Sequence, residues 1–293
     1  MTFMEWKKTE DHIIGRRHEV SDNPVCQDAH KYLEKNGIYA IALADGAGSA
    51  QYSHHGAKKA VETICEYVCV PENFQNILDV LKNNDIEKQK EIKKQIKDLL
   101  LHAIKKECEK VAKETQNEVD YKQLAATLLF VAVQDNEYIT GHIGDGFIAS
   151  LYENKSVKAL SMPKNGSFAN ETFFITDKNM ENNLEMKTGD VNTEKIRSFA
   201  LMSDGMADGL WARRQKSFVK ILSDIMEKVF YDNVAAEQNV KQLLELVKRK
   251  KTGDDCSIII ITNGGQFSDS LQEEIKLTGL EYIERTCKTE EKK

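Results

Sequence analysis

The sequence predicts an α+β domain with antiparallel sheets. Three observations support this class. Apolar runs of strand length gather in three groups along the chain, and helical periodicity fills the segments between them. The turn residues Asp135 and Asn136 separate two of the strands, as in a β-hairpin. We find no internal repeat or low-complexity linker, so we expect one domain over residues 1–265, followed by a charged, helical tail over residues 266–293.

The first half of the chain contains two expected strands and a long helical region. A strand region is expected over residues 9–20, and the basic cluster Arg16, Arg17 and His18 lies within it. Residues 38–49 (IYAIALADGAGS) predict a buried strand that stops at Asp45. Apolar residues over 57–68 recur at steps of three and four and predict a helix that ends before Pro71. The charged stretch 74–118 keeps this periodicity, which is typical of solvated helices.

In the second half the strand pattern returns. Strands are expected over residues 125–134, 137–143, 147–152, 197–203 and 256–262, and amphipathic helices over 214–230 and 233–249. Residues 161–190 are irregular, with a short strand expected at 172–176. A segment of this length without regular structure is usually functional.

Charge and hydropathy narrow the range of partners. The formal net charge of −6 argues against a nucleic-acid partner, because binding that backbone requires a cationic face. Residues 1–12 lack the apolar core of a signal peptide. The most apolar run, residues 125–133, is too short to cross a bilayer. We therefore expect a cytoplasmic protein with no membrane partner.

The six cysteines show no zinc-binding or CxxC spacing. Cys65 and Cys69 are one helical turn apart on the apolar face of an expected helix. A redox pair or a soft-metal site is one interpretation. We favour the other, that they are small buried hydrophobic residues in a reducing compartment.

Four aspartates mark the ends of expected strands. Asp45, Asp145 and Asp204 each close an apolar strand, and Asp254 precedes one. A single Asp-Gly pair most often forms a hairpin turn, but its repetition indicates a site. We expect the glycine after each strand to let the backbone turn and expose its own carbonyl. If the strands lie in facing sheets, these carboxylates converge.

Converging carboxylates repel one another and take up protons unless cations occupy the site. Oxygen ligands without paired histidines indicate Mg²⁺ or Mn²⁺ rather than zinc. Two such cations suit the hydrolysis of a phosphate ester, because they activate a water and neutralise the phosphoryl oxygens. Such ions also reconcile an acidic chain with a phosphorylated substrate.

An ordered set of motifs makes the comparison specific. The motifs are QDA (27–29), ADGAGS (44–49), IGDG (143–146), MSDG (202–205) and GDDCS (253–257). Together they resemble the metal-dependent protein phosphatase family, protein phosphatase 2C, over about residues 15–262. The resemblance implies a four-layer αββα sandwich with a flap-like segment at about 160–195. It also implies a serine/threonine protein phosphatase in which water or hydroxide bridging two Mn²⁺ or Mg²⁺ ions attacks the phosphomonoester.

The resemblance also assigns roles to residues. It implies that Asp45 bridges both metal ions and that the Gly46 carbonyl ligates one of them. Asp204 and Asp254 would hold the other ion. Asp28 would act beside Asp45 in catalysis by ordering water. Asp145 matches the position of a third, looser ion, although a simple turn remains the competing interpretation.

The chain departs from the family at several positions. Asn23 replaces the arginine that grips the substrate phosphate, and Ala47 replaces a histidine proposed as general acid. Gly146 replaces the usual serine after Asp145. These changes, with the segment 169–172, resemble a compact bacterial branch of the family. The candidates for holding the phosphate are Arg16, Arg17 and His18, and a solvated surface position is an equal alternative for both arginines.

The expected partners are a phosphorylated protein and a cognate serine/threonine kinase, and the expected state is a monomer. Two further hypotheses stay open. The missing arginine is compatible with a non-catalytic, phosphatase-like regulatory or binding module. The same scaffold could also hydrolyse small phosphorylated metabolites.

Overall fold

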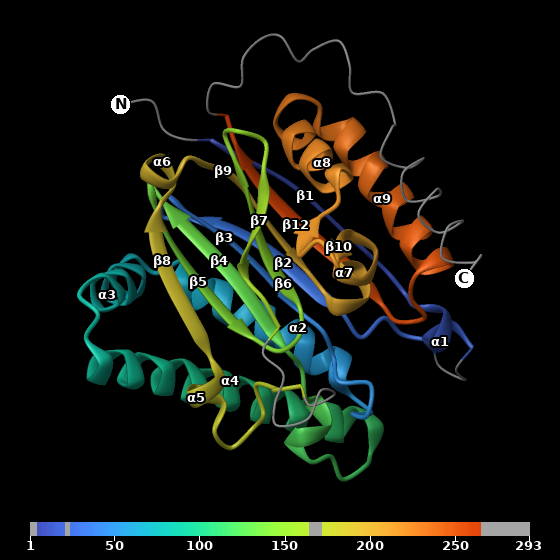
Figure 1. Cartoon of the computed structure of the whole chain (residues 1–293). Coiled ribbons are helices and arrows are strands. Elements are labelled where there is room, and N and C mark those ends of the chain that lie inside the picture. Colours follow the sequence, from blue (N-terminus) through green and yellow to red (C-terminus); the bar gives the residue numbers. More distant parts are fainter. Residues whose placement is uncertain (1–4, 21–23, 164–171, 265–293) are drawn as a thin grey trace.

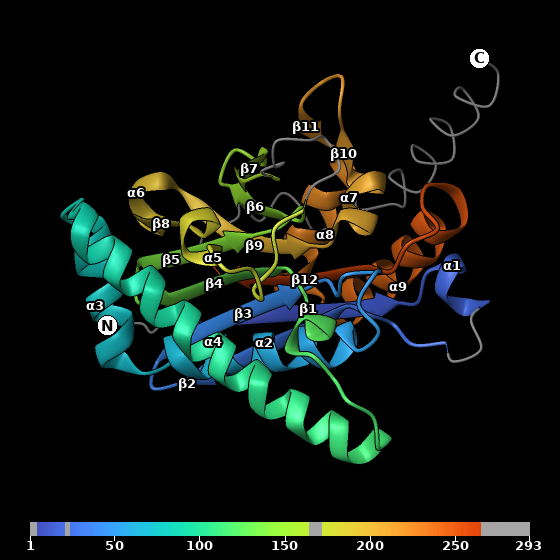
Figure 2. The ribbon, with the colours of Figure 1, turned by 90° about the horizontal axis from the view of Figure 1, so that it is seen from below.

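The computed structural model describes residues 5–20, 24–163 and 172–264. Two five-stranded antiparallel sheets pack face to face, and helices cover the outer face of each (Figure 1, Figure 2). The predicted α+β class and the αββα sandwich are confirmed. The predicted tail over 266–293, Asn23 and part of the flap-like segment, 164–171, lie outside the described residues.

Each sheet joins strands from distant parts of the chain. The first sheet has the order β1-β12-β9-β6-β7 and the second has the order β2-β3-β4-β5-β8. The first sheet contains β1 (Trp6–Ile13), β6 (Phe147–Tyr152), β7 (Val157–Ser161), β9 (Ile196–Met202) and β12 (Cys256–Asn263). The second contains β2 (Ala29–Lys35), β3 (Ile38–Ala44), β4 (Leu128–Gln134), β5 (Glu137–Ile143) and β8 (Glu185–Asp190). A separate small hairpin pairs β10 (Trp211–Ala212) with β11 (Ser217–Phe218).

Two groups of helices form the outer layers. The second sheet is covered by α2 (Ser53–Val68), α3 (Pro71–Lys82) and α4 (Ile86–Thr115). The first sheet is covered by α7 (Asp204–Leu210), α8 (Lys220–Tyr231) and α9 (Asn233–Lys250). The short helices are α1 (Arg16–Glu19), α5 (Met180–Asn183), α6 (Val191–Glu194) and the 3₁₀ turn η1 (Tyr121–Leu124). Within the described ranges, no helix has both the length and the apolar character that a membrane span requires.

The alternation of side chains along β3 explains its apolar sequence. Ala40 and Ala42 belong to the core beneath the helices, whereas Ile41 and Leu43 belong to the core between the sheets. Small residues on one face and large ones on the other let the layers interdigitate. Because both faces are buried, the strand has no polar face, and its sequence is a continuous apolar run. Strand β3 ends at Ala44, and Asp45 follows it at the edge of the core.

Several predicted elements are confirmed with small shifts. The strand ending at Asp45, the hairpin of β4 and β5, and strands β6, β9 and β12 all form. The long charged stretch is helical, but it is divided between α3 and α4 where Asn84 adopts a positive φ of 51°. Cys65 and Cys69 are free and buried, which agrees with the favoured interpretation.

Other predicted boundaries are wrong. The opening strand ends at Ile13, so the basic cluster lies on α1 and not in a strand. Residues 172–176 form no strand. The strand in that region is β8, which pairs with β5 at the edge of the sheet. An edge strand carries polar residues, so EMKTGD gives no strand signal.

The sequence around Asp204 also folds differently from the expectation. Asp204 is the first residue of α7, a short helix that was not predicted. The next helix, α8, begins at Lys220 rather than at Arg214, because β10 and β11 occupy the intervening segment. This hairpin and α7 together place a new surface beside Asp204.

Candidate metal centre

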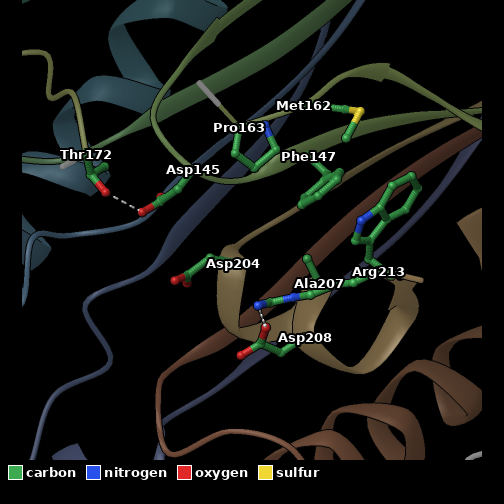
Figure 3. A pocket seen from close by; sticks show the side chains of 10 residues that line it. Asp145, Phe147, Met162, Pro163, Thr172, Asp204, Ala207, Asp208 and Arg213 are labelled. Carbon is green, nitrogen blue, oxygen red and sulfur yellow. Dashed lines mark hydrogen bonds and ion pairs between the residues drawn. The ribbon is translucent and has the colours of Figure 1, made fainter. Parts of the chain in front are cut away.

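Three of the predicted aspartates meet at one end of the sandwich. Asp45 follows β3, Asp145 follows β5, and Asp204 follows β9. One carboxylate oxygen from each lies within 4.8 Å of the others. Asp45 and Asp145 come from one sheet and Asp204 from the other, so the packing of the two sheets builds the group. Figure 3 shows Asp145 and Asp204 facing the same space.

Two threonines fix the acidic loops. The backbone N–H of Asp45 donates to Thr127 Oγ1 at 2.9 Å, and the N–H of Thr127 donates to the carbonyl of Asp45 at 2.8 Å. Thr172 Oγ1 donates to Asp145 Oδ2 at 2.6 Å (Figure 3). The first contact uses only the backbone of Asp45 and leaves its carboxylate facing the cavity.

The glycines after Asp45 and Asp204 have a different role from the predicted one. Neither Gly46 nor Gly205 has a positive φ, so no left-handed turn explains them. Instead, a Cβ atom on Gly205 would lie 2.1 Å from the carbonyl oxygen of Asp255. A Cβ atom on Gly46 would lie 2.8 Å from the carbonyl oxygen of Gln27. The absence of a side chain lets these two segments approach the neighbouring loops closely.

Asp28 and Asp254 lie around the group of three. Asp28 is buried, and Ser257 Oγ donates to its Oδ2 at 2.7 Å. Its Oδ1 is buried without a hydrogen-bond partner in the part of the chain that the structure describes. Asp254 lines the same cavity as Asp45 and Asp204 but stands outside the group within 4.8 Å.

Crowding and burial disfavour the charged forms of these groups. Burial raises the pKa of Asp45 well above its usual value, and the charges of Asp28, Asp204 and Asp145 raise it further. Burial, with the charge of Asp145, raises the pKa of Asp204 to about 6. Burial is also the main cause that raises the pKa of Asp28 to about 8. A divalent cation would relieve this repulsion.

The donor set therefore fits a hard divalent cation. The converging side-chain ligands are all carboxylate oxygens, which Mg²⁺ and Mn²⁺ prefer. The unpartnered Oδ1 of Asp28 offers a further acceptor for an ordered water. This agrees with the chemistry expected from the sequence.

The cavity also contains basic side chains. It has a volume of about 280 Å³, and its wall includes Arg17 and His18 of α1. Arg17 is brought there because its backbone N–H donates to the carbonyl of Gly253 at 2.9 Å. Arg16 instead uses its guanidinium on the carbonyl of Thr252, with N–O distances of 2.9 and 3.3 Å. The structure thus separates three residues that the sequence left equivalent.

Asp255 serves the framework around the cavity. Its two carboxylate oxygens accept the backbone N–H groups of Gly15 and Gln27, both at 2.6 Å. His18 Nδ1 lies 2.9 Å from Oδ1. One buried carboxylate therefore connects the start of β12 with α1 and the QDA loop, which is a structural role.

Several lining residues were missed by the sequence analysis. Thr127 and Thr172 position two of the aspartates, and Arg213 lines an adjoining cavity with Trp211. Single threonines and surface arginines are common, so no sequence signal separates these from others. Trp211 follows the MSDG motif by six residues, and its sequence position alone indicates packing or a contact with the flap-like segment.

Comparisons with known proteins agree with this geometry. The family model described as protein phosphatase 2C matches residues 14–245. A similar curated protein is serine/threonine-protein phosphatase 3 of Escherichia coli (strain K12). It is 25% identical over 203 residues, covering 67% of this chain and 73% of that protein.

Solved structures share the fold at low sequence identity. A bacterial serine phosphatase has a TM-score of 0.59 at 16% identity, covering 90% of this chain and 100% of the other. The catalytic domain of the serine/threonine protein phosphatase PstP, in complex with two manganese ions, has a TM-score of 0.58 at 11% identity, covering 89% and 100%. PppA of Pseudomonas aeruginosa, described as a regulatory component of T6SS, has a TM-score of 0.56 at 15% identity, covering 88% and 98%.

Proposed function

The chain belongs to the protein phosphatase 2C family, and on this premise we propose that it is a Mn²⁺- or Mg²⁺-dependent serine/threonine protein phosphatase. The observation that carries the proposal is the group of Asp45, Asp145 and Asp204, whose ligand atoms lie within 4.8 Å of one another. Without cations, three partly buried carboxylates at this distance have no structural benefit.

The proposed ligands follow from the positions around the cavity. Asp45 and the Gly46 carbonyl, with Asp204 and Asp254, would hold two ions, and Asp145 would hold a third. The two manganese ions of the PstP catalytic domain support this number. When bound, the ions supply a water of lowered pKa and neutralise the phosphoryl oxygens.

Side chains of the chain itself complete the chemistry. Asp28 orients the attacking water through Oδ1, the buried oxygen that lacks a partner among the described residues. Arg17 binds the substrate phosphoryl group in place of the family arginine. We choose Arg17 because Arg16 is turned to the carbonyl of Thr252 and His18 contacts Asp255. A guanidinium suits this task because its N–H groups match phosphate oxygens.

The test is hydrolysis of a phosphothreonine peptide and of an aryl phosphate in the presence of Mn²⁺. We expect turnover that EDTA abolishes and that Asp45→Asn removes. The matched control is Asp98→Asn, which makes the same change at an exposed position of α4. Full activity in Asp45→Asn, or activity that EDTA does not affect, would contradict the proposal.

The same assay separates the two other hypotheses. Mn²⁺ binding without turnover of any phosphate ester would favour the non-catalytic module. The position of Arg17 in the cavity wall favours the enzyme, because it restores a cation for the phosphate. Turnover of small phosphorylated metabolites but not of phosphopeptides would favour the metabolite hydrolase. The protein substrate and a cognate kinase remain part of the proposal.

A further inference from the structure

A second cavity adjoins the metal centre. It has a volume of about 560 Å³ and shares Asp145, Thr172 and Asp204 with the first. The rest of its lining is mostly apolar. The remaining lining residues are Phe147, Met162, Pro163, Ala207, Asp208, Trp211 and Arg213. Figure 3 shows Asp145 and Asp204 on one side of this space, Phe147, Met162 and Pro163 on another, and Asp208 beside Arg213.

The apolar end rests on three aromatic rings. The ring centroids of Trp211 and Phe147 are 5.3 Å apart, and those of Trp211 and Phe218 are 4.9 Å apart. Phe147 and Phe218 are 5.9 Å apart. The pairing of Trp211 with Phe218 in the hairpin of β10 and β11 fixes this arrangement. Aromatic rings in such mutual contact form a rigid platform that loses little entropy on binding.

Two of the lining residues, Met162 and Arg213, are open to contact with a ligand. Met162 is 45% exposed although it is large and apolar. Arg213 stands at the rim, paired with Asp208 at 2.8 Å with a side chain that is 81% exposed. A concave apolar surface beside a few placed polar groups is typical of a binding site. With cations held by the aspartates, the two ends of the space suit a ligand with one anionic and one apolar part.

An extended peptide meets this requirement. Successive residues advance by about 3.3 Å, so the residues next to a phosphorylated one reach only a short way along the surface. Because the two cavities share three residues, a phosphoryl group in the first places neighbouring side chains in the second. A small phosphorylated metabolite without an apolar part would leave the platform uncovered.

We propose that the platform of Phe147, Trp211 and Met162 binds a bulky apolar side chain of the substrate protein within two residues of the phosphorylated serine or threonine. The proposal rests on the proposed function and adds the substrate class to it. Trp211 and Met162 are then specificity-determining residues. The hairpin of β10 and β11, absent from the sequence expectation, supplies Trp211 to this platform.

The test compares phosphothreonine peptides that differ only by Phe or Gly at each of two positions on either side of the phosphorylated residue. With Mn²⁺ we expect Phe at one or more positions to raise kcat/KM on the order of tenfold, the selectivity of an apolar pocket. Trp211→Ala and Met162→Glu should reduce this preference to less than about twofold. Equal turnover of all peptides by the unmodified chain would overturn the inference while leaving the phosphatase activity established.

Two control variants distinguish loss of the platform from a general effect of substitution on folding. Tyr231→Ala removes an exposed aromatic ring on α8, and Ile86→Glu adds a charge at an exposed apolar position of α4. Both should keep the preference for Phe. If Trp211→Ala does not fold, Met162→Glu decides alone, because Met162 is exposed. A preference that survives in Met162→Glu would overturn the inference.

Tryptophan fluorescence gives a readout that does not depend on turnover. The chain has two tryptophans, and Trp6 is buried between the sheets with 4% exposure. The emission of Trp211 should therefore change when a Phe-containing phosphopeptide binds to the Asp45→Asn protein. We expect a Kd about tenfold lower than for the Gly peptide, and no signal change in Trp211→Phe. An identical Kd for both peptides would count against the platform, whereas failed hydrolysis of every phosphate ester would count against the proposed function.

Discussion

This fold surrounds the buried carboxylate of Asp255 and the three partly buried carboxylates of the metal centre in different ways. Asp255 accepts two backbone N–H groups at 2.6 Å and has His18 Nδ1 at 2.9 Å. The protein itself thus satisfies this negative charge. The role of Asp255 is therefore structural, because it holds the surrounding loops in place.

The carboxylates of the metal centre are compensated less completely, although Asp204 Oδ1 accepts the backbone N–H of Gly205 at 2.5 Å. Those of Asp45, Asp145 and Asp204 face one another within 4.8 Å, and burial with mutual repulsion raises the pKa values of Asp45 and Asp204. The hydroxyl of Thr172 is the contact that Asp145 receives. The difference teaches that donors, rather than burial, distinguish a structural aspartate from one placed for a cation.

The largest expected effect is the loss of catalysis when a carboxylate of the metal centre is removed. Asp45→Asn should lower kcat/KM with Mn²⁺ by more than about 1000-fold, because it removes a proposed ligand of the metal ions. At 1.4 kcal/mol for each tenfold in rate, this is a loss of more than about 4 kcal/mol of transition-state stabilisation. Steady-state hydrolysis of a phosphothreonine peptide measures it. Asp255→Asn should lose much less activity once its folded fraction is taken into account. Equal losses in both variants would remove the distinction.

The next effect is on stability, where we expect Asp255 to contribute more than Asp45. Asp255→Ala leaves buried backbone N–H groups of Gly15 and Gln27 without an acceptor and should cost about 3 kcal/mol of the free energy of unfolding. Asp45→Asn should instead raise the Tm of the metal-free protein by about 2 °C or more, because it removes a carboxyl that must either repel its neighbours or take up a proton when the chain folds. Thermal unfolding in EDTA checks both signs. A lower Tm in Asp45→Asn would show that its charge is compensated after all.

A smaller effect separates the two arginines of α1. Arg17→Ala should lower kcat/KM by about 10- to 100-fold, because a hydrogen bond to a charged group contributes about 1.5–3 kcal/mol. Arg16→Ala is the matched control, since its guanidinium contacts the carbonyl of Thr252. Peptide kinetics at saturating Mn²⁺ measure both. The assignment of the phosphate to Arg17 fails if the two variants lose the same activity.

The smallest expected effect is the pH dependence of stability. The pKa of Asp28 is raised to about 8 and that of Asp45 well above its usual value. Between pH 6 and 8 the folded chain therefore holds protons that the unfolded chain has lost, so the free energy of unfolding falls as the pH rises. The Tm in EDTA should drop over this range, and Mn²⁺ should reduce the drop. A metal-free Tm that rises with pH would contradict this account.

Sequence patterns predicted the parts of the molecule that burial dictates. Strands such as β3 and β12 are buried on both faces, so their composition alone reveals them. The aspartates at their ends were found because four of them repeat one local pattern. The edge strand β8 gave no signal, because half of its surroundings are solvent.

The rest depends on contacts between distant segments. Arg16 and Arg17 are identical in type and adjacent in sequence, and only the backbone contact with Gly253 directs Arg17 to the cavity. The role of Gly205 came from close packing against Asp255 rather than from a turn. The platform around Trp211 likewise joins β6 to a hairpin over 60 residues later, a pairing that no local pattern encodes.

The most direct test of whether the metal-centre carboxylates bind a cation is anomalous diffraction from crystals of the protein soaked in Mn²⁺. We predict manganese peaks within about 2.0–2.6 Å of carboxylate oxygens of Asp45 and Asp204, and loss of those peaks in Asp45→Asn. Crystals that hydrolyse an aryl phosphate in Mn²⁺ yet show no peak between these two aspartates would contradict the account.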